Sequence, residues 1–193
     1  AGRAVYAGEA LEGPVQSRAA SQRRDLQLVF QDPVSALNPS FRVSAIVGEP
    51  LLIHQPTLSN AGRRERVIAI LKKVGLDESC LRRYPHQLSG GQAQRVAIAR
   101  ALILEPKILI CDEAVTALDG TVRAQVLELL KDVQRESGLS IIFISHDLAV
   151  VRSISHRVAV MYLGRLVEIA DTAKLFLTPS HQYTRALLDA SPV

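Results

Sequence analysis

The chain has 193 residues, of which 48% are hydrophobic and 4% aromatic, and its formal net charge is +4. This length fits one domain, or one core with a subsidiary lobe, and the interior is expected to be aliphatic. No apolar run reaches the roughly 18 residues of a membrane-spanning helix, and no secretory signal is visible at the N-terminus, so we expect a soluble protein. Two cysteines, Cys80 in a polar loop and Cys111 in an apolar strand, indicate no disulfide framework or metal cluster and favour a reducing cytoplasm.

Basic residues gather in two short clusters, Arg63-Arg64-Arg66 and Arg82-Arg83. Neither cluster is interleaved with the aromatic residues that many nucleic-acid sites use to stack on bases. We therefore expect solvated helix faces and no nucleic-acid partner.

The N-terminal part of the chain predicts a sheet edge followed by a strand. Residues 2–11 alternate loosely beside turn glycines, which fits the edge of an antiparallel sheet, and residues 17–25 predict a short helix or loop. Residues 26–30 predict a strand that stops at Gln31, because Pro33 pushes the residue before it to extended geometry and donates no backbone hydrogen bond. Gln31 thus lies at a strand exit, where capping of the loop is its plainest role.

Residues 34–83 predict helices separated by proline and polar loops. Residues 43–53 predict a short helix interrupted near Pro50. A longer amphipathic helix ends at Gly75 and carries apolar residues at helical spacing, namely Val67, Ile70, Leu71 and Val74.

The next helix begins with Leu88-Ser89-Gly90-Gly91-Gln92. Ser89 is a suitable N-cap and Gln92 lies three residues on, as in a capping box. Gly90 and Gly91 leave backbone N–H groups of the first turn uncovered, and the positive end of a helix dipole suits an anion such as a terminal phosphate. An ordinary capped helix after a glycine turn is the alternative.

The helix that follows this start is almost wholly apolar. Residues 96–104 contain one charged residue, Arg100. We expect the helix to pack between layers of the fold and to close at Pro106.

A strand comes next. The apolar residues Ile108 to Cys111 predict a strand that is buried on both faces of a parallel sheet. Its end carries two carboxylates, Asp112 and Glu113, for which a solvated loop is the alternative.

Two further elements give an α/β alternation. Residues 121–138 predict a long amphipathic helix that is capped by Gly138, and residues 140–144 predict a buried strand that ends shortly before His146. Strand-helix-strand alternation predicts an α/β fold with right-handed parallel crossovers. Ligands of such sheets gather at the carboxyl ends of the strands, where His146 stands, although a hydrogen-bonded structural histidine is the alternative.

Together, the stretch from Leu88 to Gln92 and the later apolar strand that ends in Asp112 and Glu113 resemble the ATP-binding subunits of ABC transporters. The resemblance implies a P-loop NTPase-like α/β fold, in which a parallel sheet carries an inserted helical lobe. It also implies ATP and Mg²⁺ as ligands and hydrolysis of ATP as the reaction, with little covalent participation by the protein.

The resemblance also implies roles for individual residues. Asp112 would bind magnesium through water, and Glu113 would polarise the attacking water. Gln31, in what the family calls the Q-loop, would reach the magnesium and the water and sense the membrane subunit. His146 would be the switch histidine that contacts the γ-phosphate.

Other residues would act across a dimer interface. In the family, two subunits sandwich each ATP. Ser89, Gly90, Gly91 and Gln92 would reach the nucleotide of a second ATP-binding subunit, and Asp119 would lie in the D-loop that crosses the interface.

A narrower resemblance concerns the importer branch. Residues 181–188, together with 31–33 and 36–39, resemble the oligopeptide, dipeptide and nickel branch of ABC importers. This implies transmembrane permease subunits and, indirectly, a periplasmic or surface solute-binding protein as partners, at the cytoplasmic face of the bacterial inner membrane. A generic amphipathic terminal helix is the alternative for the tail, and residues 157–163 and 165–169 predict a hairpin before it.

By the same resemblance the chain divides into four parts. Residues 1–31 would be the remnant of an N-terminal β part that ends in the Q-loop. Residues 32–104 would form a helical lobe that contains the signature, which is the family's term for the motif Leu88-Ser89-Gly90-Gly91-Gln92. Residues 105–170 would form the ATPase core, and residues 171–193 a C-terminal extension.

No Gly-x-x-x-x-Gly-Lys-Ser/Thr motif, the phosphate loop of the family, occurs in the sequence. By the resemblance, this loop is expected upstream of residue 1. Two interpretations stay open: an ATP-hydrolysing subunit of a peptide or nickel importer whose first part lies outside this chain, or a truncated, non-catalytic subunit that lends only its signature to a partner's site. The chain by itself is expected to be inactive. An ABC protein of repair or translation would show a second cassette or a long coiled-coil insertion, and the sequence has neither.

Overall fold

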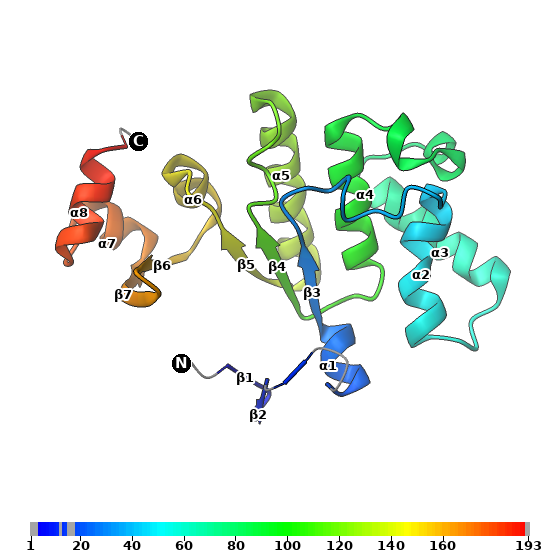
Figure 1. Cartoon of the computed structure of the whole chain (residues 1–193), viewed down its shortest axis with the longest axis horizontal. Helices are drawn as coiled ribbons and strands as arrows, with labels where there is room; N and C mark the ends of the chain where they lie inside the picture. The colour runs from blue at the N-terminus through cyan, green and yellow to red at the C-terminus, as the bar shows by residue number, and fades with distance from the viewer. Residues whose placement is uncertain (1–3, 12, 15–17, 192–193) are drawn as a thin grey trace. The chain divides into compact units, whose positions relative to one another are not determined.

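The structure is a computed structural model that describes residues 4–11, 13–14 and 18–191 (Figure 1). It divides into two compact units, residues 1–142 and 143–193. No helix within the described residues is long and apolar enough to cross a bilayer.

The described N-terminal residues form a hairpin that is tied to the first helix. Strands β1 (Val5–Tyr6) and β2 (Glu9–Ala10) pair antiparallel, as predicted for this edge, and helix α1 (Ala20–Asp25) follows. The predicted residues 2–3 and 17 lie outside the described part. The Tyr6 hydroxyl donates to Asp25 Oδ2 over 2.8 Å, and Lys107 Nζ lies 3.1 Å from the same oxygen. The Tyr6 hydrogen bond, followed by Lys107, lowers the pKa of the Asp25 carboxyl.

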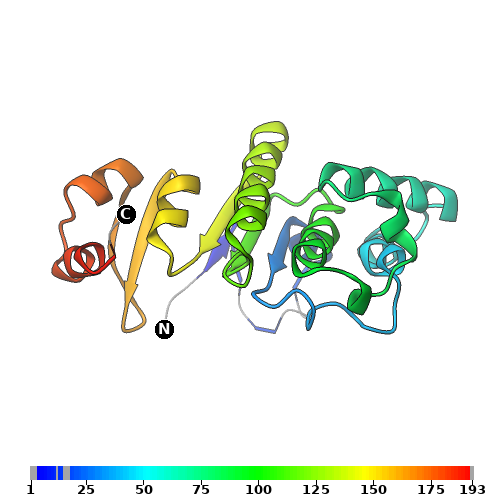
Figure 2. The same cartoon turned by 90° about the horizontal axis from the view of Figure 1, so that it is seen from above.

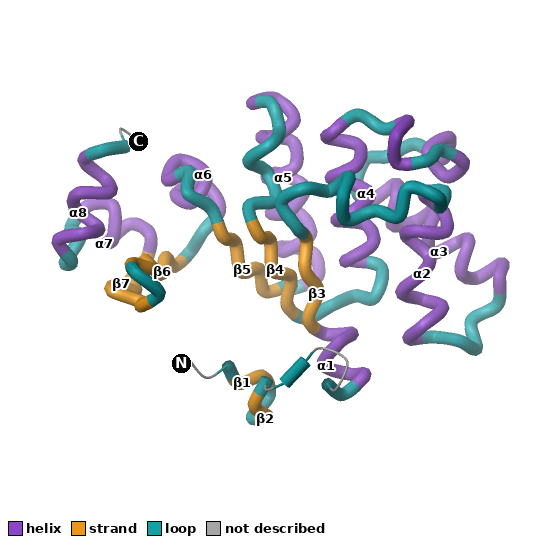
Figure 3. The backbone as a smooth tube through the Cα atoms, viewed as in Figure 1, coloured by secondary structure: helices purple, strands orange, loops and turns teal. Residues whose placement is uncertain are grey.

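The main sheet has three strands, the last of which begins in the first unit and ends in the second. Strands β3 (Leu26–Val29), β4 (Ile108–Asp112) and β5 (Ser140–Ile144) are ordered β3-β4-β5, so β4 is central (Figure 3). Strand β3 runs parallel to β4, with Leu26 opposite Ile108 and Val29 opposite Cys111. The α/β fold with a parallel sheet is therefore confirmed.

The predicted burial of β4 on both faces is wrong, and so is the predicted burial of β5. Leu109 and Cys111 of β4 are fully buried, but Ile108 and Ile110, which alternate with them, are partly exposed. In β5, Ile142 and Ile144 are 51% and 48% exposed. Helix α5 lies behind the sheet in Figure 1, and the alternation of buried and partly exposed side chains along β4 fits a sheet that is covered on one face.

The other elements of the first unit are mostly helices. They are α2 (Val43–His54), α3 (Asn60–Lys73), the 3₁₀ helices η2 (Glu78–Arg82) and η3 (Pro85–Gln87), α4 (Gly90–Leu102) and α5 (Gly120–Ser137) (Figure 2). Gly75 and Gly138 follow α3 and α5 with φ angles of +72° and +66°, as predicted for glycine at helix ends.

Two predicted helix ends are wrong. Helix α2 continues through Pro50 instead of breaking there, because Val47 and Leu51 on either side are fully buried and hold the helix against its neighbours. Helix α4 ends at Leu102, before Pro106, since Ile103 and the residues after it already turn toward β4.

Two residues that were predicted at the surface are less exposed than expected. Cys80 lies in η2 and is 2% exposed instead of lying in a polar loop, while the burial of Cys111 raises the pKa of its thiol to about 12. In the first basic cluster, Arg64 is exposed as predicted, but Arg66 donates to the Ile103 carbonyl (3.0 Å) and to Gln55 (2.7 Å).

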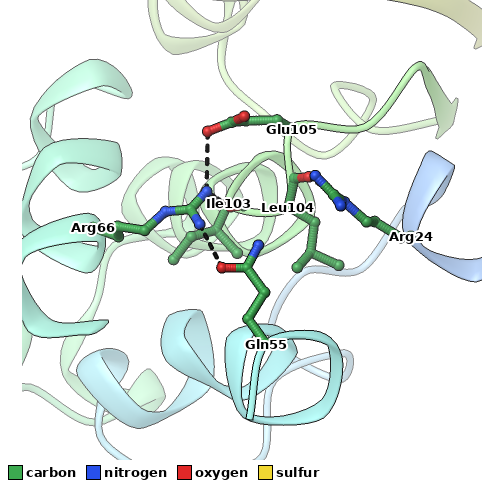
Figure 4. Close-up of polar contacts among 6 residues, drawn as sticks. All are labelled: Arg24, Gln55, Arg66, Ile103, Leu104 and Glu105. Atoms are coloured by element: carbon green, nitrogen blue, oxygen red, sulfur yellow. Dashed lines mark hydrogen bonds and ion pairs between the residues drawn. The ribbon is translucent and has the colours of Figure 1, made fainter. Parts of the chain in front are cut away.

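Figure 4 shows Arg66 between Gln55 and Glu105, whose carboxylate lies 3.0 Å away. A half-buried guanidinium can satisfy its donors on carbonyls that come from other elements, which the local charge pattern does not reveal. Arg66 thereby joins α3 to the connection between α4 and β4.

The second unit contains helix α6 (Leu148–Ile154), strands β6 (Arg157–Tyr162) and β7 (Arg165–Asp171), and helices α7 (Thr172–Leu177) and α8 (Gln182–Asp189). The predicted hairpin is confirmed: β6 and β7 pair antiparallel around Leu163 and Gly164, whose φ angles are +48° and +74°. Two positive φ angles in a two-residue turn match the right-handed twist of the strands.

Candidate functional site

The start of α4 is a capping box, as predicted. The Gln92 backbone N–H donates to Ser89 Oγ over 3.3 Å, and the Ser89 backbone N–H donates to Gln92 Oε1 over 3.1 Å. Ser89 and Gly90 are exposed. The helix therefore presents its N-terminal turn to solvent, and the two hydrogen bonds fix the side chains of Ser89 and Gln92.

The two glycines of this turn differ. A Cβ atom on Gly90 would meet no described atom within 4 Å, which leaves room for a ligand to approach the backbone. A Cβ atom on Gly91 would overlap Cγ1 of Val122 in α5. Packing against α5 thus requires a glycine at position 91, in addition to the uncovered N–H that the sequence indicates.

Sequence reasoning missed the residue that fixes this helix to its neighbours. Arg95 Nη1 donates to the Val74 carbonyl after α3 over 2.7 Å, and Arg95 Nη2 donates to Gln125 in α5 over 3.1 Å. The signal available in the sequence was an arginine directly before the almost wholly apolar stretch of residues 96–104.

The predicted carboxylates lie where β4 ends. Asp112 is the last residue of the strand and is exposed, and Glu113 follows half-exposed with a φ angle of +49°. Positive φ is uncommon for a residue with a side chain. The Glu113 carbonyl accepts from both the backbone N–H (3.2 Å) and the hydroxyl (2.8 Å) of Thr116, so the turn after it holds the backbone in this conformation.

Gln31 reaches the same edge of the sheet from the neighbouring strand. Strand β3 ends at Val29, which pairs with Cys111, so the segments that follow both strands leave at the same, carboxyl-terminal edge. Gln31 is exposed there. The parallel register therefore brings Gln31, Asp112 and Glu113 to one sheet edge, where ligands of open α/β sheets bind.

Asp119 acts as a helix cap. Its Oδ1 accepts from the Val122 backbone N–H over 3.0 Å and starts α5. At the dimer interface predicted for it, Asp119 could offer only those carboxylate lone pairs that the cap of α5 does not use.

His146 belongs to the second unit, directly after β5, and is exposed. On either side of it, Ser145 Oγ accepts from the Asp147 backbone N–H (3.0 Å), and Asp147 Oδ1 accepts from the backbone N–H groups of Ala149 (3.0 Å) and Val150 (3.2 Å). These bonds fix the turn into α6, so the chain around His146 is ordered by its neighbours.

A cavity of about 590 Å³ lies elsewhere, among α3, the end of α4 and the end of α5. Its cationic residues are paired: Arg66 with Glu105 at 3.0 Å and Lys73 with Glu136 at 3.1 Å. None of the predicted site residues lines it. The candidate site is the sheet edge together with the exposed start of α4.

Comparison with known proteins decides the family. The family model described as ABC transporter matches residues 1–116, which is more than half of the chain. The chain belongs to the ABC transporter family.

Similar curated proteins of this ABC transporter family are peptide transport subunits. The oligopeptide transport ATP-binding protein OppF of Escherichia coli is 50% identical over 192 residues, which cover 100% of this chain and 58% of OppF. The glutathione import ATP-binding protein GsiA of Pectobacterium atrosepticum is 53% identical over 175 residues, covering 89% of this chain and 27% of GsiA. The chain thus spans less than two thirds of the length of these relatives, and the predicted resemblance to the peptide branch is confirmed.

Solved ABC cassettes share the fold. The dimeric post-hydrolysis structure of MJ0796 bound to ADP and Pi superposes with a TM-score of 0.78 at 30% identity, covering 89% of this chain and 74% of that one. The structure of cbiO1 from Clostridium perfringens, part of the cbiONQ transporter complex, gives 0.78 at 29% identity over 97% and 72% of the two chains. These likenesses confirm the ABC ATPase fold.

Proposed function

We propose that this chain forms part of an ATP-binding subunit that hydrolyses ATP to energise an ABC importer for peptides. The observation that carries the proposal is the arrival of Gln31, Asp112 and Glu113 at one edge of the sheet, at the ends of the paired strands β3 and β4. The 50% identity to a protein named for oligopeptide transport supports peptides as the cargo. Nickel, the other predicted cargo, stays a prediction.

The oxygen donors at this edge fit a magnesium ion that is bound together with ATP. Magnesium takes carboxylate and amide oxygens with several waters, and Asp112 and Gln31 offer both types from exposed positions. The ion would neutralise charge on the β- and γ-phosphate oxygens. Asp112 would hold it, through water, and Gln31 would approach it from β3.

Glu113 would orient the attacking water and accept its proton. A general base must lie at a fixed distance from the water. The left-handed backbone of Glu113, held by Thr116, provides a defined direction for this side chain. His146, at the exit of β5, would contact the γ-phosphate.

The signature would serve a second subunit. The exposed N-terminal turn of α4, with Ser89, Gly90, Gly91 and Gln92, would place backbone N–H groups on the γ-phosphate of the partner's nucleotide. Asp119 would lie beside that interface. A dimeric cassette among the similar structures supports such pairing.

The remaining proposals concern assembly. The subunit would bind transmembrane permease subunits at the cytoplasmic face of the bacterial inner membrane, and a periplasmic or surface solute-binding protein would deliver the cargo. Residues 1–31 would belong to the β part, 32–104 to a helical lobe that docks on the permease, and 105–170 to the ATPase core. Residues 171–193 would form the C-terminal extension.

Two substitutions separate this proposal from the alternative of a non-catalytic subunit that supplies only its signature. In the assembled importer, Glu113→Gln should reduce steady-state ATP hydrolysis by about 10²–10⁴ if Glu113 is the base. Ser89→Arg should also abolish hydrolysis, because it places bulk and charge where the N–H groups meet a phosphate. Glu105→Gln, which changes a glutamate on the connection before β4, is the matched control and should retain activity.

Severe loss from Ser89→Arg together with unchanged hydrolysis in Glu113→Gln would contradict the active-subunit proposal and favour the signature-only alternative. Uptake of labelled peptide by the same reconstituted importer, with nickel as the competing cargo, tests the substrate class.

A further inference from the structure

The loop that carries Gln31 contains a pre-formed turn. Asp32 Oδ1 accepts from the backbone N–H groups of Val34 (3.0 Å) and Ser35 (3.3 Å), and the Ala36 N–H donates to the Asp32 carbonyl over 3.3 Å. Leu37 is 1% exposed and anchors the end of the turn in the core. Residues 32–37 therefore form one small folded unit directly after Gln31.

Arg100 of α4 binds the end of this turn. Its Nη1 donates to the Ala36 carbonyl over 2.8 Å, across 64 positions of sequence. Burial lowers the pKa of the Arg100 guanidinium, and the nearby Glu49 carboxylate of α2 favours its charged form. A half-buried, charged donor on a single carbonyl is a strong and directional contact.

Arg100 lies between β3, α2 and the turn that it binds. It lines a cavity of about 250 Å³ together with residues of β3 and α2, among them Gln27, Glu49 and His54. The helix beneath it is firmly packed, since Val96 and Ile98 are fully buried. A displacement of the Ala36 carbonyl therefore acts on a helix that is packed along its length.

The same helix begins at the signature. From the Ser89 cap to Arg100 the helix makes about three turns, or ~16 Å. We propose that Arg100 is a positioning residue that fixes the loop of Gln31 to α4, so that a displacement of this loop is passed to the exposed helix start at Ser89 and Gly90. That the Gln31 loop and the helix start at Ser89 matter for ATP hydrolysis rests on the proposed function. The contact of Arg100 with the Ala36 carbonyl does not rest on it.

Arg95 provides a matched comparison on the same helix. It is also half-buried and also donates to a distant backbone carbonyl, that of Val74, but it faces α3 and α5 instead of the loop. Loss of either arginine removes a charged donor from α4. Only loss of Arg100 should release the turn at residues 32–37.

Hydrogen exchange of the full chain without nucleotide tests the contact. In Arg100→Met, the amides of Ala36 and Leu37 should exchange at least about 10-fold faster, the scale of one hydrogen bond to a charged group. Arg95→Met should leave these two amides within about twofold of the parent. Arg100→Lys keeps one donor and should give an intermediate rate. Unchanged exchange in a folded Arg100→Met chain would overturn the proposal, and Arg100→Gln replaces that variant if it does not fold.

A second measurement tests transmission to the signature. Asp32→Ala, which loosens the turn, should change the exchange of Gln92 and Ala93 when Arg100 is present and should have no such effect in the Arg100→Met background. Equal effects in both backgrounds would refute transmission through Arg100. Because no nucleotide is used, failure here is distinct from failure of the proposed ATPase function.

Discussion

Gly91 of the signature lies against Val122 of α5 so closely that any Cβ atom at position 91 would overlap the Val122 side chain. Gly91→Ala should therefore destabilise the chain by about 1–3 kcal/mol, the usual cost of overpacking. Chemical denaturation, followed by the change in midpoint, measures this cost.

Two matched variants test the cause. Gly90→Ala adds the same methyl group into open space and should change the free energy of unfolding by less than about 1 kcal/mol. Val122→Ala removes the overlapping methyl groups, so Gly91→Ala should cost less in that background, with a coupling of about 0.5–3 kcal/mol. If the costs of Gly91→Ala and Val122→Ala in free energy of unfolding simply add, packing against Val122 is not the reason why position 91 requires a glycine.

The capping box of α4 and the hairpin at Gly164 could be predicted because they depend on residues a few positions apart. The position of Gln31 at a strand exit could be predicted from Pro33, whereas its arrival at the same sheet edge as Asp112 depends on the pairing of β3 with β4. The contact between Gly91 and Val122 could not be predicted, since it depends on how α4 and α5 cross.

Burial was predicted less well than element type. Apolar runs in β4 and β5 indicated strands correctly, but periodicity does not tell whether one or two faces of a sheet are covered, and Ile142 and Ile144 are about half-exposed. The roles of Arg66 and Arg100 were missed because their partners are backbone carbonyls distant in sequence. Every residue carries a backbone carbonyl, so the sequence does not show which of them an arginine will bind.

Arg66 should contribute more to stability than its position in a basic cluster indicates. Arg66→Met removes donors to the Ile103 carbonyl and to Gln55 (Figure 4) and should destabilise the chain by about 1–3 kcal/mol. Glu105→Gln, at a side chain 77% exposed, removes only a surface ion pair and should cost less than about 1 kcal/mol. Thermal unfolding of the two variants compares them, and equal losses would mean that the ion pair is the main contact.

Asp119 is expected to be required first as a helix cap. Asp119→Ala should destabilise the chain by about 0.5–2 kcal/mol because the Val122 N–H at the start of α5 loses its acceptor. Asp119→Asn keeps an acceptor and should retain most of this stability. If ATP hydrolysis by the assembled importer fails in Asp119→Asn while unfolding is unchanged, the carboxylate has a second role at the interface.

Glu168 of β7 is expected to hold the start of α8 down to acidic pH. The nearby Thr184 side chain, together with hydrogen bonds from the backbone N–H groups of Ser180 (2.8 Å) and His181 (3.0 Å), lowers the pKa of its carboxyl to about 2. A carboxyl whose pKa is lowered on folding stabilises the fold fully above its unfolded value of about 4.5, and this stabilisation is lost as the pH falls toward the folded value.

Protection of the α8 amides against hydrogen exchange should therefore fall between about pH 4.5 and pH 2, after correction for the intrinsic rates. Glu168→Gln, which has no charge to lose, should show weaker protection at pH 7 and little further loss across this range. Glu128→Gln changes an exposed glutamate of α5 in the other unit and is the control, with the pH dependence of α8 kept. If Glu168→Gln loses protection over the same pH range as the parent, another group controls the acid release of α8.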